Sequence, residues 1–240
     1  MRRSMFIMGA LVLVACDPKP STPPAPSSAA TTQPATTASA TVAEAVSFGR
    51  HDIQPGMKYT AKTHTVSVEQ EARLVVDCEV VAVDRGRVVK SRMRFAEARM
   101  TSTRDGETKV DPLPVEGNTY EVERIDGKLV VTKDGAQVTD DGELQWASVD
   151  IDGAGTSLPT RPLRPGEKVE ELAKREGDTT YEVTFDEREG NDGVFRSVLT
   201  SKTSSMKILC SFRARIEDGR MVSHECRHDG TTISVSYIYP

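Results

Sequence analysis

The fold class is decided by residues 206–239, which read MKILCSFRARIEDGRMVSHECRHDGTTISVSYIY. Apolar side chains and cysteines occupy alternate positions of three short segments, as expected for strands with one buried face. The turn signals Glu217-Asp218-Gly219 and Asp229-Gly230 separate the segments. The pattern predicts a three-stranded antiparallel meander with Ile216 opposite Arg220. The core-facing residues of the three strands are then Ile208, Cys210, Phe212, Ala214 and Ile216, followed by Val222, His224 and Cys226, and finally Ile233, Val235, Tyr237 and Tyr239.

The same alternation extends back to about Val46. Even positions of Ala72–Val83 are apolar or cysteine, and the next segment offers Val89, Met93 and Phe95 as its core-facing residues. A hairpin loop at 84–87 joins the two segments and places Cys78 near Met93 in the core. We therefore expect an all-β or mainly β domain, an antiparallel meander or half-barrel. One short helix is predicted over 143–151.

Two segments of the chain resemble each other. Gln54–Lys58 is similar to Arg164–Lys168, and Cys78-Glu79-Val80 is similar to Tyr181-Glu182-Val183. A duplication would give two β-units over 46–150 and 158–240 that pack as one body. The alternative is chance, because short hairpin sequences look alike.

Composition excludes some classes of protein. The chain has 240 residues and a net charge of −5, with 36 acidic against 31 basic residues. Sequence-independent nucleic-acid binding requires clustered Lys and Arg, so we expect no nucleic-acid partner. The only long apolar run is N-terminal, which excludes a protein with several membrane spans.

The N-terminus predicts export. Residues 1–15 combine two arginines with an apolar run too short to span a bilayer, as in a signal peptide. Leu13-Val14-Ala15-Cys16 closely resembles the lipobox of bacterial lipoproteins. The resemblance implies cleavage before Cys16, acylation of that residue and a lipid anchor in the bacterial cell envelope, facing the periplasm or the exterior. An ordinary signal peptide with a chance cysteine is the alternative, and the choice between inner and outer membrane stays open.

A tether follows the anchor. Residues 17–45 contain 24 Pro, Ser, Thr or Ala among 29. Such a segment cannot bury enough apolar surface to offset its ordering entropy. We expect residues 16–45 to be a disordered spacer with the folded domain at 46–240.

Cysteine spacing and export favour one disulfide. The meander register places Cys210 across from Cys226, and an exported protein experiences oxidising conditions. We expect this bridge, with Cys78 left as a buried free thiol.

Few residues suggest chemistry. His224-x-Cys226-x-His228 would align on one strand face as a metal cluster, but the expected disulfide and apolar neighbours favour a structural role. Asp150-x-Asp152-Gly153 resembles only a fragment of a calcium loop. His51 and His64 show no partner, and the pairs at 140–141 and 170–171 are most simply solvated turns. We expect no cofactor, no metal and no catalytic residues.

Residues 158–168, which we call the crossover, carry a second resemblance. Residues 158–168 carry three prolines and resemble a motif of uncharacterised bacterial lipoproteins with β-rich, carrier-like domains. These remotely resemble half-barrel carriers of lipids and lipoproteins. The resemblance implies a non-catalytic, membrane-anchored envelope lipoprotein that binds a hydrophobic or lipidic ligand on a curved sheet. The alternative is a structural or protein-interaction module of the envelope, favoured by an aromatic content of only 5%.

Overall fold

The protein is an all-β domain in a computed structural model that describes residues 44–84, 86–125, 128–147, 158–176, 179–201 and 206–240. The expected signal peptide, Cys16 and all but the last two residues of the expected tether lie outside these ranges. In the described residues, no helix is long and apolar enough to cross a membrane. The elements are β1 (Lys58–Val66), β2 (Gln70–Asp84), β3 (Arg87–Arg104), β4 (Glu107–Pro112), β5 (Thr119–Ile125), β6 (Lys128–Lys133), β7 (Ala136–Gln137), α1 (Asp141–Ala147), β8 (Glu167–Lys168), β9 (Lys174–Glu176), β10 (Thr179–Glu189), β11 (Asp192–Ser201), β12 (Lys207–Arg215), β13 (Met221–His228) and β14 (Thr231–Ile238).

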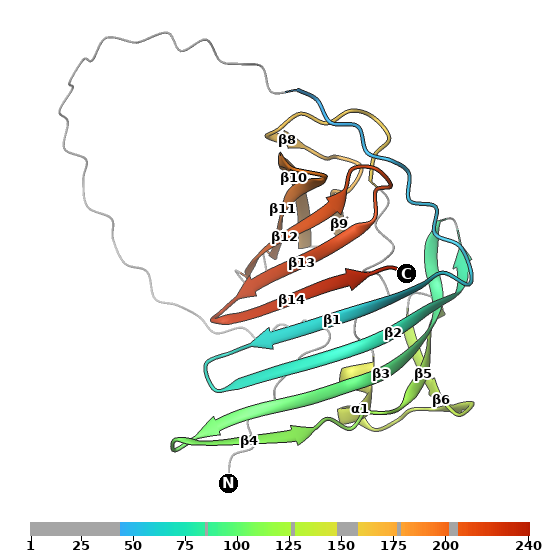
Figure 1. Cartoon of the computed structure of the whole chain (residues 1–240), viewed down its shortest axis with the longest axis vertical. Helices are drawn as coiled ribbons and strands as arrows, with labels where there is room; N and C mark the ends of the chain where they lie inside the picture. The colour runs from blue at the N-terminus through green and yellow to red at the C-terminus, as the bar shows by residue number, and fades with distance from the viewer. Residues whose placement is uncertain (1–43, 85, 126–127, 148–157, 177–178, 202–205) are drawn as a thin grey trace, which may run out of the picture.

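All strands belong to one twisted antiparallel sheet, shown in Figure 1. Its order is β7-β6-β5-β3-β2-β1-β14-β13-β12-β11-β10-β8, with β4 beside β3 and β9 beside β10. The first strand pairs with the last, so β1 and β14 form a seam between the N-terminal and C-terminal halves. At this seam Lys62 lies opposite Ser236 and His64 opposite Ser234.

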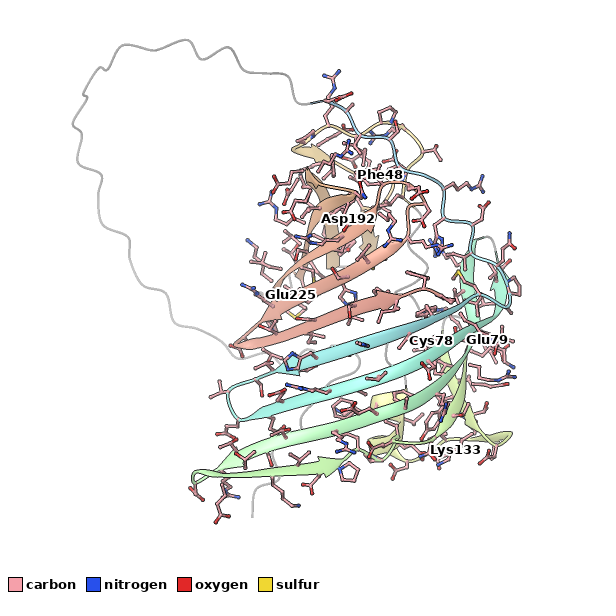
Figure 2. The ribbon with its side chains drawn as sticks, viewed as in Figure 1. Phe48, Cys78, Glu79, Lys133, Asp192 and Glu225 are labelled. Carbon is pink, nitrogen blue, oxygen red and sulfur yellow. A yellow bond between two sulfur atoms is a disulfide. The ribbon has the colours of Figure 1, made fainter. Side chains whose placement is uncertain are left out.

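One face of the sheet carries the core. In β2, the residues at even positions from Ala72 to Val80 are buried, which confirms the predicted inward face. Cys78 lies opposite Met93, as predicted. Figure 2 labels Cys78 and its neighbour Glu79, whose side chains lie on opposite faces of the sheet because strand residues alternate.

The predicted core position of Val89 is wrong. Bulges near the β2–β3 turn shift the register, so that Val83 lies opposite Val88. Val88 is only 3% exposed, whereas Val89 is half-buried. A bulge inserts one residue into a strand and thereby exchanges the two faces beyond it, which simple alternation cannot show.

The C-terminal meander is confirmed with two corrections. Cys210 lies opposite Cys226, and the two-residue Asp229-Gly230 turn joins β13 to β14. The predicted pairing of Ile216 with Arg220 is wrong, because Arg215 instead exchanges backbone hydrogen bonds at this point, accepting from Gly219 and donating to Arg220. A bulge in β13 places Met221, rather than Val222, opposite Ala214. Met221 is accordingly the buried residue.

The segment 44–57, which we call the strap, leads into β1 along the ends of the C-terminal strands (Figure 1). Val46 and Leu163 exchange two backbone hydrogen bonds of 2.7 and 2.8 Å. The ring of Phe48, labelled in Figure 2, packs on Phe185 and Phe195 with centroid distances of 5.7 and 5.4 Å. Gly49 is required here, because a Cβ atom would lie 1.9 Å from the Glu217 carbonyl oxygen. The strap is therefore part of the core.

The two similar Pro-Gly segments form the same local structure. Gly56 and Gly166 both have positive φ, of 86° and 82°, as the third residue of a type II turn requires. Gly56 donates to the Val80 carbonyl and Gly166 to that of Phe185, both at 2.7 Å. By this geometry Val80 and Phe185 occupy equivalent positions. The sequence similarity instead matched Val80 with Val183, two residues earlier. The duplication itself stays a prediction.

The crossover 158–168 bends at Thr160-Arg161, forms an isolated bridge at Leu163 and turns at Gly166 into β8. Its Arg161 guanidinium binds Glu167 and Glu171, the latter at 2.6 Å. Leu163 is fully buried on the Val46 bridge. The predicted short helix is also present as α1, and residues 148–151 of that prediction lie outside the described residues. Trp146 and Ala147 are its buried residues.

Candidate functional site

A hollow of about 670 Å³ crosses the polar face of the sheet. We call it the trough and define it by two rows of side chains that the strand register aligns across the seam. The first row runs from β2 to β12 and consists of Arg73, His64, Ser234, Glu225 and Ser211. The second row runs from β3 to β11 and consists of Glu97, Val75, Lys62, Ser236, Ser223, Arg213 and Val194.

The trough is long because it crosses seven strands. Six strand spacings of about 4.8 Å give a length of roughly 29 Å. Its remaining lining residues lie between the two rows on the same strands; Thr63, Leu74, Phe212 and Val235 are buried, and His224 is half-buried. A ligand in the trough would therefore contact mainly the side chains of the two rows, which include Val75 and Val194.

The floor at the seam consists of short side chains. Ser234 and Ser236 of β14 lie beside Ser223 of β13, and Ser211 continues the floor on β12. Along β14, the larger Thr232 and Ile238 flank the serines on the same face. Small side chains between larger ones leave a depression in this face of the sheet.

Cations lie on both sides of the serine floor. Lys62 on β1 has no ion-pair partner among the residues that the structure describes. Arg213 on β12 is oriented by Glu189. On strand spacing alone, these two positions lie about 14 Å apart, three strands from each other.

Side chains of the first row form more hydrogen bonds and ion pairs with neighbouring side chains than those of the second row do. Glu71, beside the trough, accepts from Arg73 at 2.6 Å and contacts His64 Nε2 at 2.9 Å. The hydrogen bond from Arg73, and then that from His64, holds the pKa of Glu71 below its usual range. Glu225, labelled in Figure 2, accepts from Ser234 at 3.3 Å and forms an ion pair with Arg227 at 2.7 Å. By contrast, the hydroxyls of Ser211, Ser223 and Ser236 bond to no group in the described part of the chain.

The cysteine and histidine residues that the sequence suggested as candidates have structural roles. The sulfur atoms of Cys210 and Cys226 are 2.07 Å apart, at disulfide distance, and Cys78 is buried and free. His224 Nδ1 lies 3.1 Å from the Tyr237 hydroxyl, and His228 is exposed at the end of β13. The disulfide thus occupies the central member of the His-x-Cys-x-His pattern.

The other sequence candidates are distributed over the molecule. His64 contacts Glu71 and His51 is buried beside the Tyr239 ring, so the expectation that these histidines lack partners is wrong. Asp140 caps α1 by accepting from the Glu143 backbone N–H at 2.8 Å. Both acidic pairs are exposed, but only Glu170-Glu171 lies in a turn as predicted, and Glu171 also binds Arg161; Asp140-Asp141 instead begins α1. The Asp150-x-Asp152 fragment lies outside the described residues.

The buried Tyr120 is at the centre of an electrostatic cluster. The Tyr120 hydroxyl donates to Glu143, which also pairs with Lys133 at 3.0 Å, and Lys133 is labelled in Figure 2. Burial, then the Glu143 carboxylate, raises the pKa of Tyr120. The Tyr120 and Lys133 hydrogen bonds lower that of Glu143. General acid–base catalysis favours pKa values near the working pH, so shifts in these directions indicate a structural role that fixes α1 on β5 and β6.

Comparison with known proteins gives a distant structural likeness. No protein-family model and no curated protein matches the chain. A solved structure from Bacteroides fragilis, described as an exported protein with a YmcC-like fold, is 13% identical. That alignment covers 80% of this chain and 97% of the other, with a TM-score of 0.31.

Proposed function

We propose that this protein is a non-catalytic, lipid-anchored binding protein of the bacterial cell envelope, and that the trough is its ligand site. The observation that carries the proposal is the hollow of about 670 Å³, a size suited to a small molecule or a short polymer segment. Its lining combines free hydroxyls with fixed charges, which select a polar ligand by hydrogen bonds. The lipobox resemblance supports the anchor.

The trough favours a polar ligand over the hydrophobic one suggested by the crossover motif. A lipid carrier requires an apolar cavity, whereas the trough lies on the face opposite the core. On the described core face, rings such as Phe95, Phe185 and Phe195 are fully buried. Their packing supports a filled interior and leaves the polar face for recognition.

Native mass spectrometry of protein purified from membranes tests the binding site. Ser236→Trp places a large side chain on the trough floor, and Thr108→Trp on exposed β4 is the matched control. We expect a co-purifying polar ligand with the wild type and the control, and its loss from Ser236→Trp. A ligand retained by Ser236→Trp, or a lipid bound equally by all three, would overturn the proposal.

Fractionation tests the anchor separately. Cys16→Ser removes the acylated thiol and should leave a soluble, exported precursor. If this variant sediments with membranes as the wild type does, the anchor is not attached at Cys16.

A further inference from the structure

We infer that the trough binds an acidic oligosaccharide in an extended conformation, laid across β1, β14, β13 and β12. This inference rests on the proposed binding function and specifies its ligand. The second row places Lys62, Ser236, Ser223 and Arg213 on four adjacent strands. These four side chains thus present a cation, two hydroxyls and a second cation, each one strand spacing from the next.

The charge pattern requires two separated acidic groups. Lys62 and Arg213 lie about 14 Å apart by strand spacing. Arg213 is held toward Glu189 of β10, on the side away from Lys62, so one phosphate or carboxylate does not contact both cations. Lys62 is exposed and has no ion-pair partner among the described residues, so its ammonium is available to a ligand. Glu189 orients the Arg213 guanidinium. A chain with acidic groups at two of its units would meet both cations.

The hydroxyl floor specifies what lies between the acidic groups. A serine hydroxyl both donates and accepts, as does a sugar hydroxyl, so Ser236 and Ser223 can pair with hydroxyl-bearing units in either sense. An acidic peptide fits less well, because its backbone amides seek backbone partners. The backbone N–H and C=O groups of the interior strands β14 and β13 already form hydrogen bonds with the neighbouring strands.

The acidic residues of the trough lie away from the part of the second row that would hold an anionic ligand. Glu225 is held by Arg227 and Ser234 in the first row. Glu97 lies on β3, beyond Val75 and outside the Lys62–Arg213 interval. The segment between the two cations is therefore free of carboxylates on its own row.

Calorimetric titration of the purified full chain tests the inference with three probes of similar length: tetragalacturonate, neutral maltotetraose and tetraglutamate. We expect saturable binding of tetragalacturonate that weakens as salt is added, and at least tenfold weaker binding of the other two. Lys62→Gln and Arg213→Gln should each weaken tetragalacturonate binding about tenfold, since each removes a charge-assisted hydrogen bond. Lys58→Gln, on the same face of β1 but outside the trough, should change it less than about twofold.

The serines and the fold are checked in parallel. The double variant Ser223→Ala with Ser236→Ala should weaken binding several-fold while the melting temperature of every variant stays within about 2 °C of the wild type. Equal affinity for tetraglutamate, no saturable binding of tetragalacturonate, or wild-type binding by both charge variants would overturn the inference. If tetragalacturonate fails while Ser236→Trp still loses a co-purified polar ligand, the ligand assignment is wrong and the trough remains a binding site. Retention of that ligand by Ser236→Trp would instead remove the binding function itself.

Discussion

Deleting the Phe48 ring should destabilise the whole domain, although this residue precedes the first strand. Phe48 is 6% exposed and packs on Phe185 and Phe195. The ring fills space above Gly193, where a Cβ atom would lie 2.4 Å from its Cζ. Phe48→Ala leaves a cavity at this point, and the loss of a buried phenylalanine costs about 3–5 kcal/mol. For a domain of this size, that corresponds to a fall in melting temperature of roughly 6–20 °C.

Far-UV circular dichroism of the full chain measures this fall during heating. Ser47→Ala, on the exposed neighbouring residue, is the control and should melt within about 1 °C of the wild type. Removal of residues 1–43 should also leave the melting temperature nearly unchanged, whereas removal of residues 1–49 should lower it at least as much as Phe48→Ala. A fall below about 3 °C for Phe48→Ala would refute the conclusion that the strap belongs to the core.

Three further outcomes follow from the packing and the charges. Val88→Asp should lower the melting temperature much more than Val89→Asp, because the bulge buries Val88; equal effects would contradict the register. Glu143→Gln should lower the melting temperature at pH 7, and the difference from wild type should close toward pH 3. The reason is that the folded-state pKa of this carboxyl is depressed, so its stabilisation is full above its ordinary pKa of 4.5 and is lost as the pH falls through the lower value. Reduction of the Cys210–Cys226 bridge should cost roughly 3 kcal/mol, and non-reducing peptide mapping should recover these two cysteines in one linked peptide pair.

Local pattern was enough to predict most of the strand pairing in the C-terminal meander. The Asp229-Gly230 turn fixes the register between β13 and β14, and Cys210 faces Cys226 as expected. The errors occur at the bulges near Val89 and Val222 and at the turn between β12 and β13, where Arg215 rather than Ile216 pairs with Arg220. A bulge depends on how two strands coil against each other, and neither strand carries that information alone.

The strap was missed for a different reason. Val46 was predicted as the start of the domain, but its partner Leu163 lies in the distant crossover. Phe48 is an isolated aromatic residue without strand periodicity around it. Its burial follows from rings contributed by β10 and β11, so the signal available in the sequence was a phenylalanine next to a glycine that tolerates no side chain.

The trough could not be predicted because it exists only across the seam. Alternation indicates that Lys62 is on the polar face of its strand and that Ser236 is on the polar face of another, but the two residues come from opposite ends of the folded chain. Their pairing depends on β1 lying against β14, where Lys62 is opposite Ser236. Whether or not the halves arose by duplication, neither half contains the site, because β1 contributes one cation and β12 the other. Ligand binding and seam closure should consequently be linked, since a ligand that contacts both cations binds only the chain in which the two halves are joined.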